Sequence, residues 1–191
     1  WHEIFNRQPI MTDSQSQISQ ARLLLTGRCT LDVRREFRNV IAFPYAVYDV
    51  PSFSQFPPGH VLLLAPFLRV GLPPQALNMV AGIVTILLIG SLARRLEGPA
   101  VARAACLMLV ASPLMMQMSV SAMNHATACL MLWLAAWCLL PMAESGDGAA
   151  RPGLAWSFVA GLALGWAVMT RPLTGLAHSL VWGGLWLALM A

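Results

Sequence analysis

The sequence has little charge, and its basic residues include no lysine. Only 10% of the 191 residues are charged, whereas a soluble domain usually carries about 25%. A soluble fold needs polar surface to stay in water, so this shortage of charge indicates a chain surrounded by lipid. The twelve basic residues are arginines, and they form no stripe with aromatic residues. Nucleic-acid binding therefore has little support.

Motifs of several common enzyme classes are also absent from the sequence. It contains no Gly-rich phosphate loop and no nucleophile elbow. The four cysteines lack metal-ligand spacing, so we infer neither a metal site nor a disulfide, and we expect no cofactor. No basic segment leads into an apolar signal region. There is no initiator methionine and the final apolar run has no polar flank, so we expect a fragment of a longer chain.

The charges that are present divide the chain into two parts. Residues 1–60 hold five of the eight acids and six of the arginines. The remaining residues hold three acids and six arginines in a sequence that is otherwise strongly apolar. We therefore interpret residues 1–60 as a water-facing segment and the rest as membrane-embedded.

The water-facing segment contains one clear helix signal. Thr12 and Gln15 fit a capping box and Gly27 fits a C-terminal stop. Between them, Ile18 and Ala21 belong to an amphipathic strip. Such a helix could lie at the membrane interface, or it could be a surface helix packed on its own domain.

Residues 61–72 form an apolar run that is too short to span a bilayer, which takes about 20 residues. This run also contains Pro66 and Arg69, so we expect an interfacial or half-inserted helix. Residues 73–191 are predicted to form a bundle of about five spans, the last one truncated. The candidate spans are Pro74–Ala93, Ala100–Pro113 with a possible continuation toward Ser121, Ala126–Met142, Gly153–Met169 and Leu173–Ala191. The predicted fold class is therefore an all-α integral membrane protein.

Arginine placement predicts the orientation of this bundle. Arg94, Arg95 and Arg103 share one short loop, and Arg151 lies in the next loop on the same side. Positive loops stay cytoplasmic. Residues 1–60 and the turns near residues 117–125 and 170–174 would then meet on the extracytoplasmic face.

Asp13 is the candidate catalytic residue of this face. It lies at the start of the predicted helix, where the helix dipole favours a carboxylate. It is either a simple capping acid or a general base that takes a proton from an acceptor hydroxyl.

Arg171 and the polar stretch Ser119–His125 are the candidate binding groups. Arg171 interrupts an apolar stretch on the side where positive charge is not expected, so something negative should balance it. A guanidinium fits a phosphate, but a salt bridge to Asp13 or Asp49, or contact with lipid headgroups, would also serve. Asn124 and His125 need polar partners, supplied by the protein or by a substrate.

Two further candidates have ordinary structural explanations as well. Gln17 belongs to the same helix as Asp13. His60 follows Pro57-Pro58-Gly59, where a structural histidine in a turn at the interface is the simpler explanation. Gly161 and Gly165 make a small-xxx-small pattern that predicts close helix packing.

The order of these segments resembles the GT-C membrane glycosyltransferases of the protein O-mannosyltransferase and aminoarabinose-transferase type. Each motif is short, but together they cover nearly the whole chain. The stretches that carry the resemblance are Thr12-Asp13-Ser14-Gln15 with the helix that follows, Tyr48-Asp49 with Ser54-Gln55-Phe56-Pro57-Pro58-Gly59-His60, Ala111-Ser112-Pro113 through Asn124-His125, and Gly161 through Thr170-Arg171-Pro172.

This resemblance implies an inverting glycosyltransferase of the cell envelope, located in the plasma or inner membrane. The donor would be a polyprenyl-phosphate-linked sugar, and the active site would face the extracytoplasmic side. Asp13 would match the catalytic acid position, and Arg171 and His125 would lie near the donor. Asn124, Gln17 and His60 complete the set of substrate-binding candidates. The family commonly has a second acid after the first, where this chain has Ser14.

Two other classes of function fit the same composition. A transporter or lipid flippase would also have intramembrane polar groups, although we see no internal repeat of the kind transporters often show. A non-catalytic membrane subunit would require Asp13 to be only a helix cap. The sequence specifies neither the sugar nor the acceptor.

Overall fold

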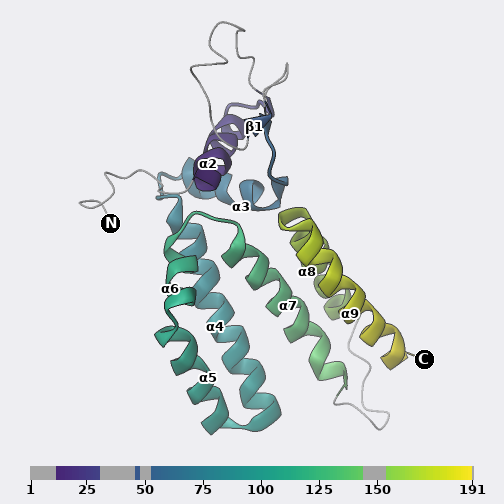
Figure 1. The fold of residues 1–191 in the computed structure, drawn as a ribbon. Coiled ribbons are helices and arrows are strands. Elements are labelled where there is room, and N and C mark those ends of the chain that lie inside the picture. The colour runs from purple at the N-terminus through teal and green to yellow at the C-terminus, as the bar shows by residue number, and fades with distance from the viewer. Residues whose placement is uncertain (1–11, 31–45, 48–52, 144–153, 191) are drawn as a thin grey trace, which may run out of the picture.

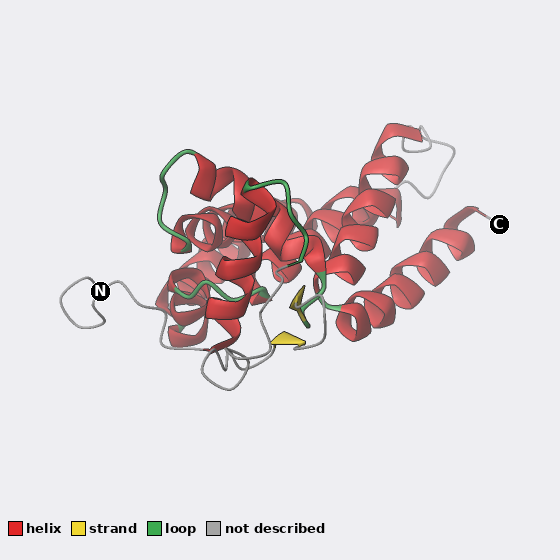
Figure 2. Cartoon of the chain, turned by 90° about the horizontal axis from the view of Figure 1, so that it is seen from above, coloured by secondary structure: helices red, strands yellow, loops and turns green. Residues whose placement is uncertain are grey.

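The computed structural model describes residues 12–30, 46–47, 53–143 and 154–190. The predicted loop Glu144–Pro152, and Asp49 with it, lie outside these residues. Within them the chain is almost entirely helical, as Figure 2 shows. The elements are α2 (Thr12–Leu25), β1 (Ala46–Val47), β2 (Phe53–Ser54), α3 (Pro58–Arg69), α4 (Gln75–Glu97), α5 (Pro99–Ala111), α6 (Pro113–Val120), α7 (His125–Ala143), α8 (Leu154–Thr170) and α9 (Pro172–Met190).

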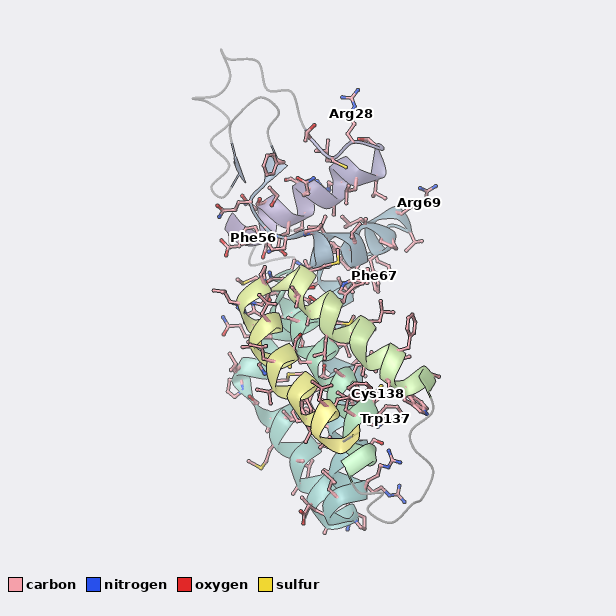
Figure 3. All side chains as sticks on the ribbon, turned by 90° about the vertical axis from the view of Figure 1, so that its right-hand side faces the viewer. Arg28, Phe56, Phe67, Arg69, Trp137 and Cys138 are labelled. Carbon is pink, nitrogen blue, oxygen red and sulfur yellow. The ribbon has the colours of Figure 1, made fainter. Side chains whose placement is uncertain are left out.

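These elements form two layers (Figure 1). Helices α4 to α9 form a bundle whose long axes run in broadly the same direction. Helices α2 and α3, with the β1–β2 pair, lie across one end of that bundle. We call α2, α3 and the β1–β2 pair the platform. In Figure 3, Arg28 and Arg69 extend outward from the platform, whereas Trp137 and Cys138 lie far from it within the bundle.

Helix α2 is held against α3 by an apolar core. Ile18 and Ala21 are buried against Val61 and Leu64 of α3, and Ala122 joins the same cluster. Removal of such side chains from water is the main stabilising contribution of a small core. Gly27 follows the helix with a φ of 76° and its N–H donates to the carbonyl of Leu24, so the predicted stop is confirmed. The helix therefore packs on α3 of its own chain, while its position at the membrane interface stays a prediction.

Helix α3 is short because its start signal and its end lie only 12 residues apart. Pro58 occupies its first turn, where a missing N–H costs nothing, and the helix ends at Arg69 after 12 residues. At 1.5 Å per residue it is roughly 18 Å long, less than a bilayer core. It lies across the ends of the bundle helices, so the expected short helix is present.

Helix α4 is long and apolar enough to cross a membrane by itself. Helices α5 and α6 pass the same test only as a pair, bent by 62° at Ser112-Pro113. Pro113 has no N–H to continue α5, and the hydroxyl of Ser112 accepts from the N–H of Met115 to begin α6. Helices α7 and α8 contain shorter apolar stretches. All predicted apolar runs are therefore helical, while five spans remain a prediction.

The bundle exposes many large apolar side chains on its outer surfaces. Ile83 of α4, Leu107 of α5 and Leu180 of α9 are 59%, 70% and 78% exposed. Monomeric soluble proteins rarely expose large contiguous apolar patches. This surface is what helices in contact with lipid would present.

Glycine packing differs from the prediction. A Cβ added at Gly161 or Gly165 would meet nothing within 4 Å, so these glycines do not mediate a close helix contact. The close approach between α8 and α9 occurs at Gly175, where an added Cβ would lie 2.6 Å from the carbonyl carbon of Ala167. The prediction of close helix packing at Gly161 and Gly165 is therefore wrong, because those two positions face open space.

Candidate active site

Asp13 lies in the first turn of α2 and is half-buried. An acidic residue suits this position, because free backbone N–H groups and the positive end of the helix dipole attract negative charge. Because α2 is fixed on α3 by the apolar core, the carboxylate has a defined place at the platform.

His125 and Arg171 occupy the ends of bundle helices next to the platform. His125 is the first residue of α7, and Arg171 stands between the last residue of α8 and Pro172, the first of α9. Both are half-buried. Asp13 and Arg171 both lie close enough to His125 for their charges to act on its imidazole. One anion and one cation, predicted from distant parts of the sequence, therefore lie near the same histidine.

The backbone that carries Arg171 is fixed by Asn124. The Asn124 amide donates to the carbonyl oxygen of Thr170 over 3.1 Å, and the Asn124 side chain is buried. The hydroxyl of Thr170 donates to the carbonyl of Trp166, one turn earlier. Asn124, predicted to bind substrate, is thus already engaged with the residue before Arg171, and so it positions the α8–α9 junction.

The same junction is tied to the start of α3. The indole N–H of Trp166 donates to the Gly59 carbonyl over 3.0 Å. An added Cβ at Gly59 would lie 2.7 Å from the carbonyl oxygen of Met169, so only glycine fits this contact. The platform and α8 therefore meet at van der Waals distance one residue before His60.

His60 is buried beneath the platform, and only 1% of it is exposed. Its Nδ1 lies 3.0 Å from the hydroxyl of Thr127, which also donates to the Asn124 carbonyl. Burial lowers the pKa of His60 to about 4, an effect that the Ala122 backbone partly offsets. The Ala122 backbone lies near the ring, yet within the described part of the chain Nε2 makes no hydrogen bond of acceptable geometry. His60 is thus a neutral, internal residue of α3 rather than an interfacial turn residue.

Gln17 is equally buried, at 1% exposed, and its Oε1 has no hydrogen-bond partner among the described residues. It lies one helical turn after Asp13 on α2. Of the six candidates, Asp13, His125 and Arg171 are half-buried at one end of the bundle, while the other three form the buried layer behind them.

Sequence reasoning missed several residues that build this region. Asn78 of α4 donates to the carbonyl oxygens of Ser121 and Met123 over 2.7 and 2.6 Å and holds the turn before α7. An amide within an apolar run was a visible signal of such a role. Nothing in the sequence pairs Trp166 with Gly59.

The six candidate residues form no metal site, and they do not line the cavity of the platform. No group of three potential metal ligands occurs within the described ranges. A cavity of about 510 Å³ lies between α2, β2 and α3, and its lining includes Leu24, Phe53 and Phe56 but none of the six candidates. Gln20, one of its lining residues, donates to the Cys29 carbonyl and accepts from the Ser54 N–H.

Comparison with known protein families identifies the chain. The family described as dolichyl-phosphate-mannose-protein mannosyltransferase matches residues 57–188. The chain belongs to this mannosyltransferase family. The match runs from the start of α3 almost to the end of α9, and it confirms the GT-C resemblance. Asp13 and Gln17 precede the matched region.

Membership makes the chain part of a family of membrane glycosyltransferases. The family's name describes enzymes that transfer mannose from dolichyl phosphate to protein. Dolichyl-phosphate mannose as the donor and protein as the acceptor are therefore properties of the enzymes after which the family is named. No curated protein and no solved structure matches the chain significantly.

Proposed function

We propose that this chain forms the donor-binding and proton-accepting part of a glycosyltransferase that uses a polyprenyl-phosphate-linked sugar. The observation that carries the proposal is that Asp13 and Arg171 both act on His125 at the platform end of the bundle. An anion-binding group and a proton acceptor are the two functions that this reaction requires.

Arg171 is the group that binds the donor phosphate. A guanidinium offers a rigid fork of N–H donors that matches phosphate oxygens. As the bond from the anomeric carbon to the phosphate oxygen breaks, negative charge collects on the phosphate. A fixed cation beside it stabilises that charge more in the transition state than in the ground state.

Asp13 is the general base. The acceptor hydroxyl attacks the anomeric carbon from the face opposite the phosphate, so the configuration inverts. Its oxygen forms the new bond, its proton passes to Asp13, and the polyprenyl phosphate leaves with the electron pair of the broken bond. His125, near both charges, donates a hydrogen bond to a phosphate or sugar oxygen.

The platform faces the extracytoplasmic side in this proposal. Arg94 and Arg95 lie in the last turn of α4, at the end of the bundle away from the platform. Positive charge at that end favours a cytoplasmic location for it. The acceptor then reaches Asp13 from the extracytoplasmic water, and the carrier chain remains among the bundle helices.

Asp13→Asn in the complete protein tests this function. The amide keeps the shape of the side chain and its capping capacity but cannot take the proton. With mannosyl polyprenyl phosphate as donor, we expect release of polyprenyl phosphate to fall about 100-fold or more, while donor affinity stays the same. Arg22→Gln, an exposed change at the other end of α2, is the matched control. Normal turnover by a normally expressed Asp13→Asn protein would overturn the proposed role.

A further inference from the structure

A second cavity lies between α7, α8 and α9, within the bundle and away from the platform. Its volume is about 270 Å³. The residues that define it include Leu139 of α7, Ala160 and Gly161 of α8, and Trp182, Gly183 and Trp186 of α9. None of the candidate catalytic residues lines it.

The packing between α8 and α9 is tight next to Arg171 and leaves open space at two glycines farther from the platform. At Gly175, next to Arg171, an added Cβ would collide with the backbone of α8. Farther along, an added Cβ at Gly161 or Gly183 would meet nothing within 4 Å. Trp182 and Trp186 of α9 pack against the cluster of Cys138, Leu139 and Ala160.

The interior of the cavity suits an apolar ligand only. Its one hydroxyl among the lining residues, Ser157, already accepts a hydrogen bond from the indole N–H of Trp186 over 3.3 Å. A water molecule needs two to four polar partners, and this lining offers few, so an apolar ligand displaces water from it at little cost. A sugar, a phosphate or a peptide backbone would lose its hydrogen bonds here.

The cavity also lies at a defined depth below Arg171. Leu164, the lining residue of α8 nearest to Arg171, precedes it by seven residues, and Ser157 precedes it by fourteen. At 1.5 Å per residue, these positions are roughly 10 and 21 Å along the helix from the guanidinium. A linear apolar chain attached to a phosphate at Arg171 would run along α8 into this space.

We propose that this cavity binds the isoprenoid chain of the donor several isoprene units away from the phosphate, and that it makes transfer depend on carrier length. The inference rests on the proposed function, because it takes a polyprenyl phosphate held at Arg171 as its starting point. Gly161 and Gly183 are the specificity-determining residues, since the absence of their side chains provides the room.

Filling the cavity tests the inference, and the chain provides matched controls. Gly183→Phe places an aromatic ring in the cavity, whereas Gly184→Phe places the same ring at the next residue, outside the lining. Gly161→Leu and its control Gly165→Leu repeat the comparison on α8 and cover the case in which Gly183→Phe does not fold. The donors are mannosyl phosphate on a long polyprenyl chain and on a short analogue that ends before the cavity.

We expect Gly183→Phe and Gly161→Leu to raise KM for the long-chain donor about tenfold, because contacts with several methylene groups are lost. KM for the short-chain donor should stay unchanged, and the two control variants should resemble the wild type with both donors. An equal change in KM for both donors, or no change for either, would overturn the inference. The cavity would then be a feature of protein packing or a site for a phospholipid chain. A wild-type protein that uses neither donor would overturn the proposed function itself.

Discussion

At the scale of single residues, the half-buried charges and the buried polar groups have different tasks. Asp13, His125 and Arg171 lie where several helix ends meet, and each retains some exposure. Asn124 and His60 lie behind them and contact protein atoms. A buried polar group without partners costs free energy, so such groups in a site are usually employed in holding it together. Positioning is therefore the role that their geometry supports.

His60 makes stability depend on pH in a defined direction. Its pKa is lowered to about 4 in the folded protein by burial, against 6.5 when unfolded. The unfolded chain therefore binds the extra proton first, and the stability that the neutral ring contributes is complete above about pH 6.5 and is lost as the pH falls toward 4. The loss reaches about 3 kcal/mol at most.

Unfolding of the protein and of His60→Gln, followed by tryptophan fluorescence between pH 7 and 4, measures this effect. We expect the wild type to lose more stability than the variant across that window. Parallel pH profiles for the two proteins would mean that His60 keeps its ordinary pKa.

Asn124→Asp separates positioning from substrate binding. The carboxylate keeps the shape of the amide but cannot donate to the Thr170 carbonyl, so two oxygens would face each other at the 3.1 Å contact. A buried acceptor left unsatisfied costs about 1–3 kcal/mol. We expect a loss of stability of that size together with a higher KM for the donor, since Arg171 follows Thr170. Reduced kcat with unchanged stability would instead indicate direct contact between Asn124 and the substrate.

At the scale of elements, the helices were predictable and their junctions were not. Apolar runs bounded by proline, glycine or arginine predicted α4, α7, α8 and α9 to within a few residues. The sequence indicated only that the span Ala100–Pro113 could continue toward Ser121. It did not indicate the 62° bend between α5 and α6. The meeting of Gly59 with Met169 depends on contacts between segments more than 100 residues apart, which no local pattern encodes. Local signals therefore predicted which residues face the platform end, and tertiary packing decided which of them stay accessible.

The α8–α9 contact at Gly175 is the junction most sensitive to substitution. Gly175→Ala adds a methyl group where a Cβ would lie 2.6 Å from the Ala167 carbonyl carbon, so the two helices must separate. Overpacking of this kind costs typically about 1–3 kcal/mol. Gly184→Ala, in open space on the same helix, should stabilise by about 0.5–1 kcal/mol because alanine favours helix.

Thermal unfolding of both variants in the same detergent provides the comparison. Because Arg171 begins the α8–α9 turn, we also expect Gly175→Ala to weaken donor binding while Gly184→Ala leaves it unchanged. Equal stability of the two variants would show that α8 and α9 are not in contact at this point.

At the scale of the whole molecule, the function depends on how the platform lies on the bundle. Helix α2 brings Asp13 to the bundle end where α7 begins and where α8 turns into α9. Neither layer holds both charged groups alone. The central claim is that donor bound at Arg171 occupies the space beside residue 13 on the extracytoplasmic side.

Donor protection of residue 13 tests that claim most directly. Asp13→Cys, in a background with the four native cysteines replaced, is labelled with a membrane-impermeant thiol reagent, with and without mannosyl polyprenyl phosphate. The account predicts that the reagent reacts from the extracytoplasmic side, that donor slows the reaction, and that Arg171→Gln abolishes this protection. A thiol introduced by Arg22→Cys, at the exposed end of α2, should react equally fast with or without donor. Labelling of the residue 13 thiol only from the cytoplasmic side, or at a rate that donor never changes, would contradict the account.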